Sequence, residues 1–163
     1  MWPALLVWVV PSPAAEPTVS TDDAGVVRAT AIVSAPVADA LALVRDPDAV
    51  HRLSGDGATL TATPDGGCYR LAYALDTAIA DVAYTARACP TADGFRSDLT
   101  ESEAFRSMAS EWTVRAVPGG TELTYVYRAD VALPLPRFVI RRSTERAITE
   151  MMARVVARLD GGH

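Results

Sequence analysis

Few side chains in this sequence could do acid–base or metal chemistry, and they are scattered. The histidines are His51 and His163, and the second is the terminal residue. The cysteines, Cys68 and Cys89, lack the paired spacing of a zinc site. A Ser-His-acid triad needs a histidine beside its serine, and only His51 is available for that role. We therefore expect no catalytic set, no metal and no cofactor, with His51 as a solvated helix-surface residue.

The meaning of the two cysteines depends on the pairing of neighbouring strands. A two-residue loop at 78–79 sets Cys68 opposite Cys89, which favours a disulfide in an oxidising compartment. The same pairing sets Arg70 opposite Arg87, and like charges that face each other destabilise a sheet. A disulfide and two free thiols are therefore both left open.

Composition restricts the class of protein. The chain has 163 residues, of which 50% are hydrophobic and 21% charged, which predicts one folded domain. Its 15 basic residues, all arginine, stand against 20 acidic ones, so the net charge is −5. This balance lacks the basic footprint of a nucleic-acid-binding protein, and we expect no nucleic-acid partner.

The N-terminus carries an apolar run from Trp2 to Val10. As a helix it spans about 14 Å, too short for a bilayer core of about 30 Å. Ser12 and Ala14 resemble the small residues before a secretory cleavage site, although no arginine precedes Arg28. We expect a signal peptide at 1–14, a linker at 15–24, the domain at 25–160, a tail at 161–163 and an extracytoplasmic location. The alternative is an apolar extension packed on the domain.

The elements that position these side chains follow from periodicity. The pattern predicts a strand over 26–33, then a helix capped by Ser34 and a second helix from Asp46 to Leu53. Alternating strands follow up to Val131, joined by connections too short for crossover helices, so they form an antiparallel meander. Pro136 opens a final helix over 137–159, whose apolar side must pack on the meander.

The hairpin at Gly119-Gly120 predicts a specific pairing of strands. A two-residue turn formed by these glycines sets Val114 opposite Tyr125 and Trp112 opposite Tyr127. It also sets Glu111 opposite Arg128 on the other face. The fold class expected is α+β, a curved meander of about seven strands around the C-terminal helix.

The order of strand, two short helices, meander and long helix resembles the helix-grip fold of the START and polyketide cyclase/dehydrase superfamily, which includes the birch-pollen-allergen-like proteins (SRPBCC). The resemblance covers about residues 25–159. It rests on Val33–Leu41, Asp46-Pro47, the Trp112–Tyr127 hairpin and Leu133–Pro136, the last of these START-like. It implies an apolar cavity between sheet and final helix, and binding or transfer of a lipid, sterol or polyketide. Many relatives carry tryptophan near the second helix, where this chain has His51 and Leu53.

Strand parity and helix spacing place a set of candidate ligand-binding residues on the faces that enclose this cavity. Glu101 and Arg141 are the charged members, expected either to pair inside the cavity or to lie at its ends. The candidates are Tyr69, Leu71, Tyr73, Val82, Tyr84, Phe95, Leu99, Glu101, Met108, Ser110, Trp112, Tyr125, Tyr127, Ile140, Arg141, Thr144, Ala147, Ile148 and Met151.

Three functions are compatible with these features. We favour an exported, non-enzymatic carrier of a hydrophobic small molecule, monomeric, with no membrane span but transient membrane contact. The first alternative is a cyclase/dehydrase- or hydrolase-type enzyme that uses tyrosines, Glu101 or His51 in the same cavity. The second is a domain with a filled core that acts through partners.

Overall fold

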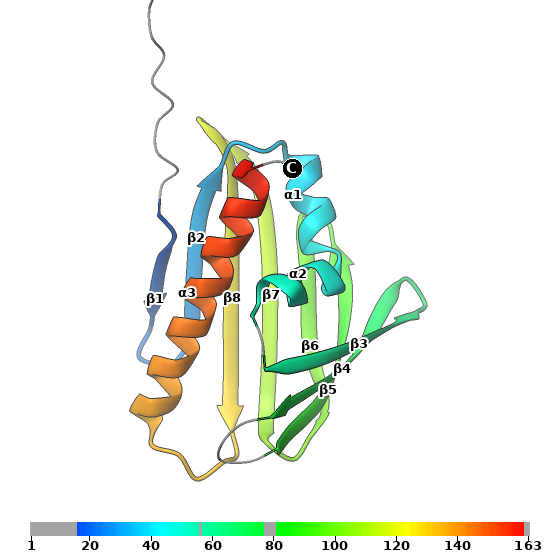
Figure 1. Ribbon diagram of the computed structural model, residues 1–163, viewed down its shortest axis with the longest axis vertical. Helices are drawn as coiled ribbons and strands as arrows, with labels where there is room; N and C mark the ends of the chain where they lie inside the picture. Colours follow the sequence, from blue (N-terminus) through cyan, green and yellow to red (C-terminus); the bar gives the residue numbers. More distant parts are fainter. Residues whose placement is uncertain (1–15, 56, 77–80, 162–163) are drawn as a thin grey trace, which may run out of the picture.

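The sheet and the last helix account for most of the chain (Figure 1). The computed structural model describes residues 16–55, 57–76 and 81–161, so the expected signal peptide at 1–14 lies outside the described residues. The strands are β1 (Thr18–Thr21), β2 (Val27–Val33), β3 (Ala58–Asp65), β4 (Cys68–Asp76), β5 (Asp81–Thr91), β6 (Gly94–Ser102), β7 (Phe105–Val117) and β8 (Gly120–Val131). The helices are α1 (Val37–Val44), α2 (Pro47–Leu53) and α3 (Arg137–Gly161).

The strands form one antiparallel sheet in the order β1-β2-β8-β7-β6-β5-β4-β3. The α+β helix-grip prediction is therefore confirmed, with eight strands rather than about seven. The additional strand is β1, which lies within the range expected to be a linker. It forms because Thr18–Thr21 pair with residues 27–30 across a tight turn in which Gly25 has a φ of 81°.

The two short helices begin differently from each other. Asp46 caps α2 as predicted, accepting a hydrogen bond from the Ala49 N–H at 3.1 Å. The predicted cap of α1 is wrong, because Pro36 occupies that position without a side-chain bond. Ser34 instead donates its N–H and its hydroxyl to Asp160, at 2.8 and 2.9 Å, and so joins the start of α1 to the end of α3.

The β7–β8 hairpin differs from the predicted pairing by two residues. Val117 pairs with Gly120, so the turn is Pro118-Gly119, and Trp112 lies opposite Tyr125. Gly119 takes the left-handed conformation with a φ of 93°, as such a turn requires. Gly120 packs against β2, where an added Cβ would lie 2.3 Å from the Val33 carbonyl oxygen. A shift of two residues keeps every side chain on its predicted face.

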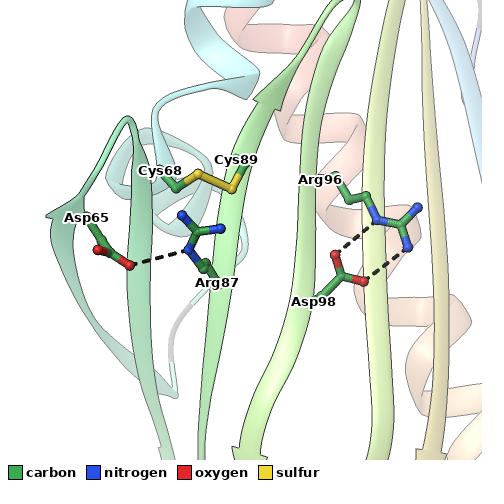
Figure 2. Close-up of a disulfide and its surroundings, with 6 residues drawn as sticks. All are labelled: Asp65, Cys68, Arg87, Cys89, Arg96 and Asp98. Carbon is green, nitrogen blue, oxygen red and sulfur yellow. Dashed lines mark hydrogen bonds and ion pairs between the residues drawn. A yellow bond between two sulfur atoms is a disulfide. The ribbon is translucent and has the colours of Figure 1, made fainter.

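The β4–β5 pairing is the one that the sequence left open. Cys68 and Cys89 form a disulfide, with their Cα atoms 4.3 Å apart (Figure 2). Arg70 lies opposite Arg87, as the same register requires, while the loop at 78–79 lies outside the described residues. Arg87 reaches the Asp65 carboxylate at 3.4 Å, which offsets part of the repulsion between the two arginines.

The core lies between the sheet and α3, which runs along β1 and β2. The inner face, defined as the face of the sheet toward α3, carries Val27, Leu71 and Trp112 into one hydrophobic cluster. α3 adds Ile148, Met151, Met152, Val155 and Val156 to that cluster. None of the described helices is both long and apolar enough to cross a membrane.

Candidate ligand-binding site

The inner face curves because two strand pairs contain bulges. The β5–β6 register shifts between Thr85 and Ala86, and the β7–β8 register shifts between Phe105 and Ser107. Each bulge adds a residue to one strand, which bends it and increases its twist. Figure 1 shows the result: β3–β5 are turned strongly relative to β7 and β8.

Four phenol rings gather on this curved face and form what we call the tyrosine cluster: Tyr73, Tyr84, Tyr125 and Tyr127. Tyr73 and Tyr84 stack on neighbouring strands, with ring centroids 4.7 Å apart. Phe105 meets Tyr84 edge-on at 5.3 Å. The rings offer aromatic walls and several hydroxyls from β4, β5 and β8.

The hydroxyls of the cluster are held neutral. Burial raises the pKa of Tyr73 to about 12. Burial is also the largest cause of the raised pKa values of Tyr84 and Tyr127, to which neighbouring tyrosines add. Burial raises the pKa of Tyr125 as well, while a side-chain hydrogen bond with Ser110 opposes the shift. At physiological pH these groups can donate hydrogen bonds, but they do not act as anions.

The same four side chains are only half-buried. Each of the four is therefore desolvated by surrounding protein and still keeps part of its surface accessible. His51 on α2 lies beside the cluster, with its ring 6.1 Å from that of Tyr73. It is half-buried, and so less exposed than the solvated surface histidine that the sequence predicts. The tyrosine cluster is therefore the candidate ligand-binding site.

The structure places most predicted site residues on the inner face or on the side of α3 that packs there. The buried ones are Leu71, Val82, Phe95, Met108, Trp112, Ile148 and Met151. The half-buried ones are Tyr69, Tyr73, Tyr84, Leu99, Ser110, Tyr125, Tyr127, Ile140 and Thr144.

Glu101 is not among them, and its predicted inward orientation is wrong. Leu99 pairs with Ala86, but Glu101 pairs with Thr85, because the bulge leaves Thr100 as the additional residue. The bulge reverses the alternation of side chains beyond it. Glu101 is consequently exposed on the outer face.

Arg141 and Ala147 are also exposed, which contradicts their predicted orientation. Arg141 lies on the same helical stripe as Ile148, but the buried residues of α3 begin only at Ile148. The first turns of α3 therefore do not pack closely on the sheet. Arg141 pairs instead with Glu145 at 3.1 Å, so the internal Glu101–Arg141 pair does not exist.

Phe105 and Ser102 are inner-face residues that the sequence analysis missed. Phe105 pairs with Val131, and Ser102 pairs with Tyr84. The Ser102 hydroxyl accepts hydrogen bonds from the backbone of residues 104 and 105, at 3.0 and 3.2 Å. Regular alternation counted from Leu99 and Met108 points both side chains outward, and no residue pattern marks the two bulges.

A hollow of about 340 Å³ lies on the outer face of β5 and β6, away from the tyrosine cluster. Its arginines are engaged by carboxylates (Figure 2): Arg96 bonds Asp98 at 3.0 Å and Arg87 reaches Asp65 at 3.4 Å. These pairs leave little free charge for a ligand. Among the described residues, no three His, Cys, Asp or Glu side chains gather to hold a metal ion.

Comparison with solved structures identifies the same architecture in several organisms. The protein TTHA0849 of Thermus thermophilus superposes with a TM-score of 0.72 at 14% identity, covering 84% of this chain and 98% of that one. A START superfamily protein of Mycobacterium smegmatis gives 0.68 at 15% identity, over 85% and 99%. The Zhui aromatase/cyclase of Streptomyces sp. R1128 gives 0.59 at 15% identity, over 84% and 92%.

No curated protein matches the chain in sequence. The sequence profile of one protein family, described as polyketide cyclase / dehydrase and lipid transport, matches residues 24–160. This range includes every described strand except β1, together with α1, α2 and all of α3 but its last residue. The fold is one used for binding hydrophobic ligands and for polyketide cyclisation. The chain therefore belongs to the polyketide cyclase/dehydrase and lipid transport family.

Proposed function

We propose that this protein is an exported carrier that binds a hydrophobic small molecule against the tyrosine cluster. One observation carries the proposal: four phenol rings are desolvated by surrounding protein and yet stay accessible on a curved, largely apolar face. Such a surface buries an apolar body and offers a few hydrogen-bond donors to its polar groups. Membership of the family supports this class of ligand.

Export is supported by two features. Ser12 and Ala14 have the small side chains of a secretory cleavage site. The Cys68–Cys89 disulfide suits an oxidising compartment such as a periplasm or the extracellular space. A carrier in such a compartment would move a sparingly soluble molecule through water.

The second candidate is an enzyme of the cyclase type, as the aromatase/cyclase among the structural neighbours is named. The contact between the rings of His51 and Tyr73 favours it, since both groups can transfer protons. The raised pKa values of the tyrosines oppose it, because a phenol with a pKa near 12 is a weak acid at neutral pH. We favour the carrier for this reason.

The test is binding of an environment-sensitive hydrophobic fluorophore to the purified full chain, with native mass spectrometry to detect a co-purifying ligand. Ala129→Phe enlarges a half-buried inner-face residue next to the cluster, and Ala83→Phe makes the same change at an exposed position of β5. We expect Ala129→Phe to weaken fluorophore binding about ten-fold, the equivalent of roughly 1.4 kcal/mol. Ala83→Phe should leave it unchanged. Equal affinities of the two variants would overturn the assignment of the site.

A further inference from the structure

The beginning of α3 carries most of the large apolar side chains that are exposed in the described residues. The large exposed hydrophobic residues among the described ones are Ile32, Phe138 and Val139, with exposed fractions of 39%, 69% and 38%. Two of these three are adjacent, in the first turn of α3. Pro134 and Pro136, which precede them, are also exposed. We call residues 133–142 the α3 tip.

The charge of the α3 tip is opposite to that of the whole protein. It holds Arg137, Arg141 and Arg142 and no acidic residue, whereas the whole chain carries −5. Helical spacing sets Arg141 and Arg142 one turn beyond Phe138, on either side of it. Arg141 pairs with Glu145, but its side chain is still 57% exposed. An apolar side chain surrounded by arginines is the arrangement of helices that lie at an anionic membrane surface.

The α3 tip lies at the end of the molecule that is nearest the tyrosine cluster. β8 ends there and β5 and β7 begin there, so Tyr84, Phe105 and Tyr127 lie in that half of the sheet (Figure 1). The acidic residues Asp81, Glu101, Glu103 and Asp130 also belong to this end. Asp130 is paired with Arg106 at 3.1 Å, and the other three lie at the start of β5, at the end of β6 and in the β6–β7 connection. Repulsion of these acids by anionic headgroups would tilt the molecule so that α3 approaches first.

We propose that the α3 tip docks the protein on an anionic lipid bilayer, with Phe138 inserted between headgroups and Arg137 and Arg142 against their phosphates. Docking would bring the curved inner face next to the membrane, where a carrier collects or releases its ligand. This second step rests on the proposed function, whereas the docking itself does not. A bilayer fits the α3 tip because its arginines can keep their charged ends at the headgroups while their stems lie along apolar surface.

The experiment is co-sedimentation of the full chain with vesicles of phosphatidylglycerol or of phosphatidylcholine. We expect binding to phosphatidylglycerol vesicles that weakens as salt is added, and weaker binding to phosphatidylcholine. Phe138→Ala should lower the partition coefficient about ten-fold. Arg142→Gln should lower it about five-fold. The matched controls Ile32→Ala and Arg158→Gln change an exposed apolar residue and an exposed arginine away from the α3 tip, and should bind as the unchanged chain does.

The apolar run at residues 2–10 is present in every variant, so it cannot account for differences between them. It also lacks basic side chains and gives no preference for phosphatidylglycerol. Equal binding to the two vesicle types, or equal binding by the unchanged chain and Phe138→Ala, would overturn the docking proposal, as would failure of the unchanged chain to bind. A variant that loses vesicle binding but still binds the fluorophore shows that the two sites are separate. If Ala129→Phe does not weaken fluorophore binding, the proposed function fails but the docking proposal stands.

Discussion

Single residues decide how the inner face meets the helices that cover it. Gly94 begins β6 and is buried, and an added Cβ there would lie 1.7 Å from the backbone oxygen of Trp112. Arg45, at the end of α1, donates to the Gly94 carbonyl at 3.1 Å and to the Thr91 carbonyl at 2.7 Å. The lack of a side chain at Gly94 therefore lets β6 lie close to β7. The hydrogen bonds of Arg45 join α1 to the start of β6.

Gly94→Ala tests this contact. Because the clash is with backbone rather than with a flexible side chain, we expect the free energy of unfolding to fall by about 3 kcal/mol. Urea denaturation measures it. Gly161→Ala is the control, since a Cβ at Gly161 meets nothing within 4 Å, and its stability should stay within about 0.5 kcal/mol of the unchanged chain. If the free energy of unfolding of Gly94→Ala equalled that of the control, β6 and β7 would accommodate the added Cβ without loss of stability, and the close contact would not matter.

At the scale of elements, the disulfide joins β4 to β5 across their register. It closes a segment of sequence separation 21 and lies next to the Arg70–Arg87 pair, where like charges oppose strand pairing. The bond limits the conformations of the unfolded chain between Cys68 and Cys89. Two strands of the inner face, which carry Tyr73 and Tyr84, therefore depend on a covalent link for part of their stability.

Replacement of both cysteines by serine should lower the free energy of unfolding by about 3 kcal/mol, the chain-entropy value for a loop of this length. Denaturation with and without a reducing agent tests whether the loss of stability comes from the loss of the disulfide. The reductant should destabilise the unchanged chain by a similar amount and leave the double variant unaffected. If the double variant were as stable as the oxidised chain, β4 and β5 would pair without help from the bond.

The tyrosine cluster is a property of the whole molecule, because residues distant in sequence share one desolvated site. A tyrosine in the unfolded chain has a pKa near 10, and burial raises that of Tyr73 to about 12 in the folded protein. Between these values the folded state binds more protons than the unfolded state, so stability falls as the pH rises. The chain has no lysine and its cysteines are bonded, which leaves tyrosines as the side chains that titrate in this range.

We therefore expect the free energy of unfolding to be constant near pH 9 and to decrease steadily between pH 10 and pH 12. Urea denaturation at stepped pH measures the slope, and tyrosinate absorbance reports the ionisation. Tyr73→Phe should make the decrease shallower, because it removes one of the shifted groups. A stability independent of pH up to 12, with all the tyrosines ionising near pH 10, would show that these hydroxyls are not desolvated.

Much of the fold could be predicted because it follows from short-range patterns. Alternation of residues along β4, β5 and β8 depends only on the two-residue repeat of a strand, and it placed Tyr73, Tyr84 and Tyr127 on the correct face. The hairpin pairing was off by two residues, an error that preserves faces. Asp46 before Pro47 predicted the start of α2 for an equally local reason.

The features that could not be predicted from the sequence depend on contacts between distant segments. The bulges that turn Glu101 outward and Phe105 inward lie in the β5–β6 and β7–β8 pairs, four strands that curve together, and no local residue pattern specifies them. The exposure of Arg141 depends on how far α3 extends beyond its packing on β1 and β2. The antiparallel meander, the faces of its strands outside the bulges and the family were thus determined by the sequence itself. Only the tertiary structure decided the curvature of the sheet and which tyrosines meet, because curvature is the sum of many pairings and belongs to none of them.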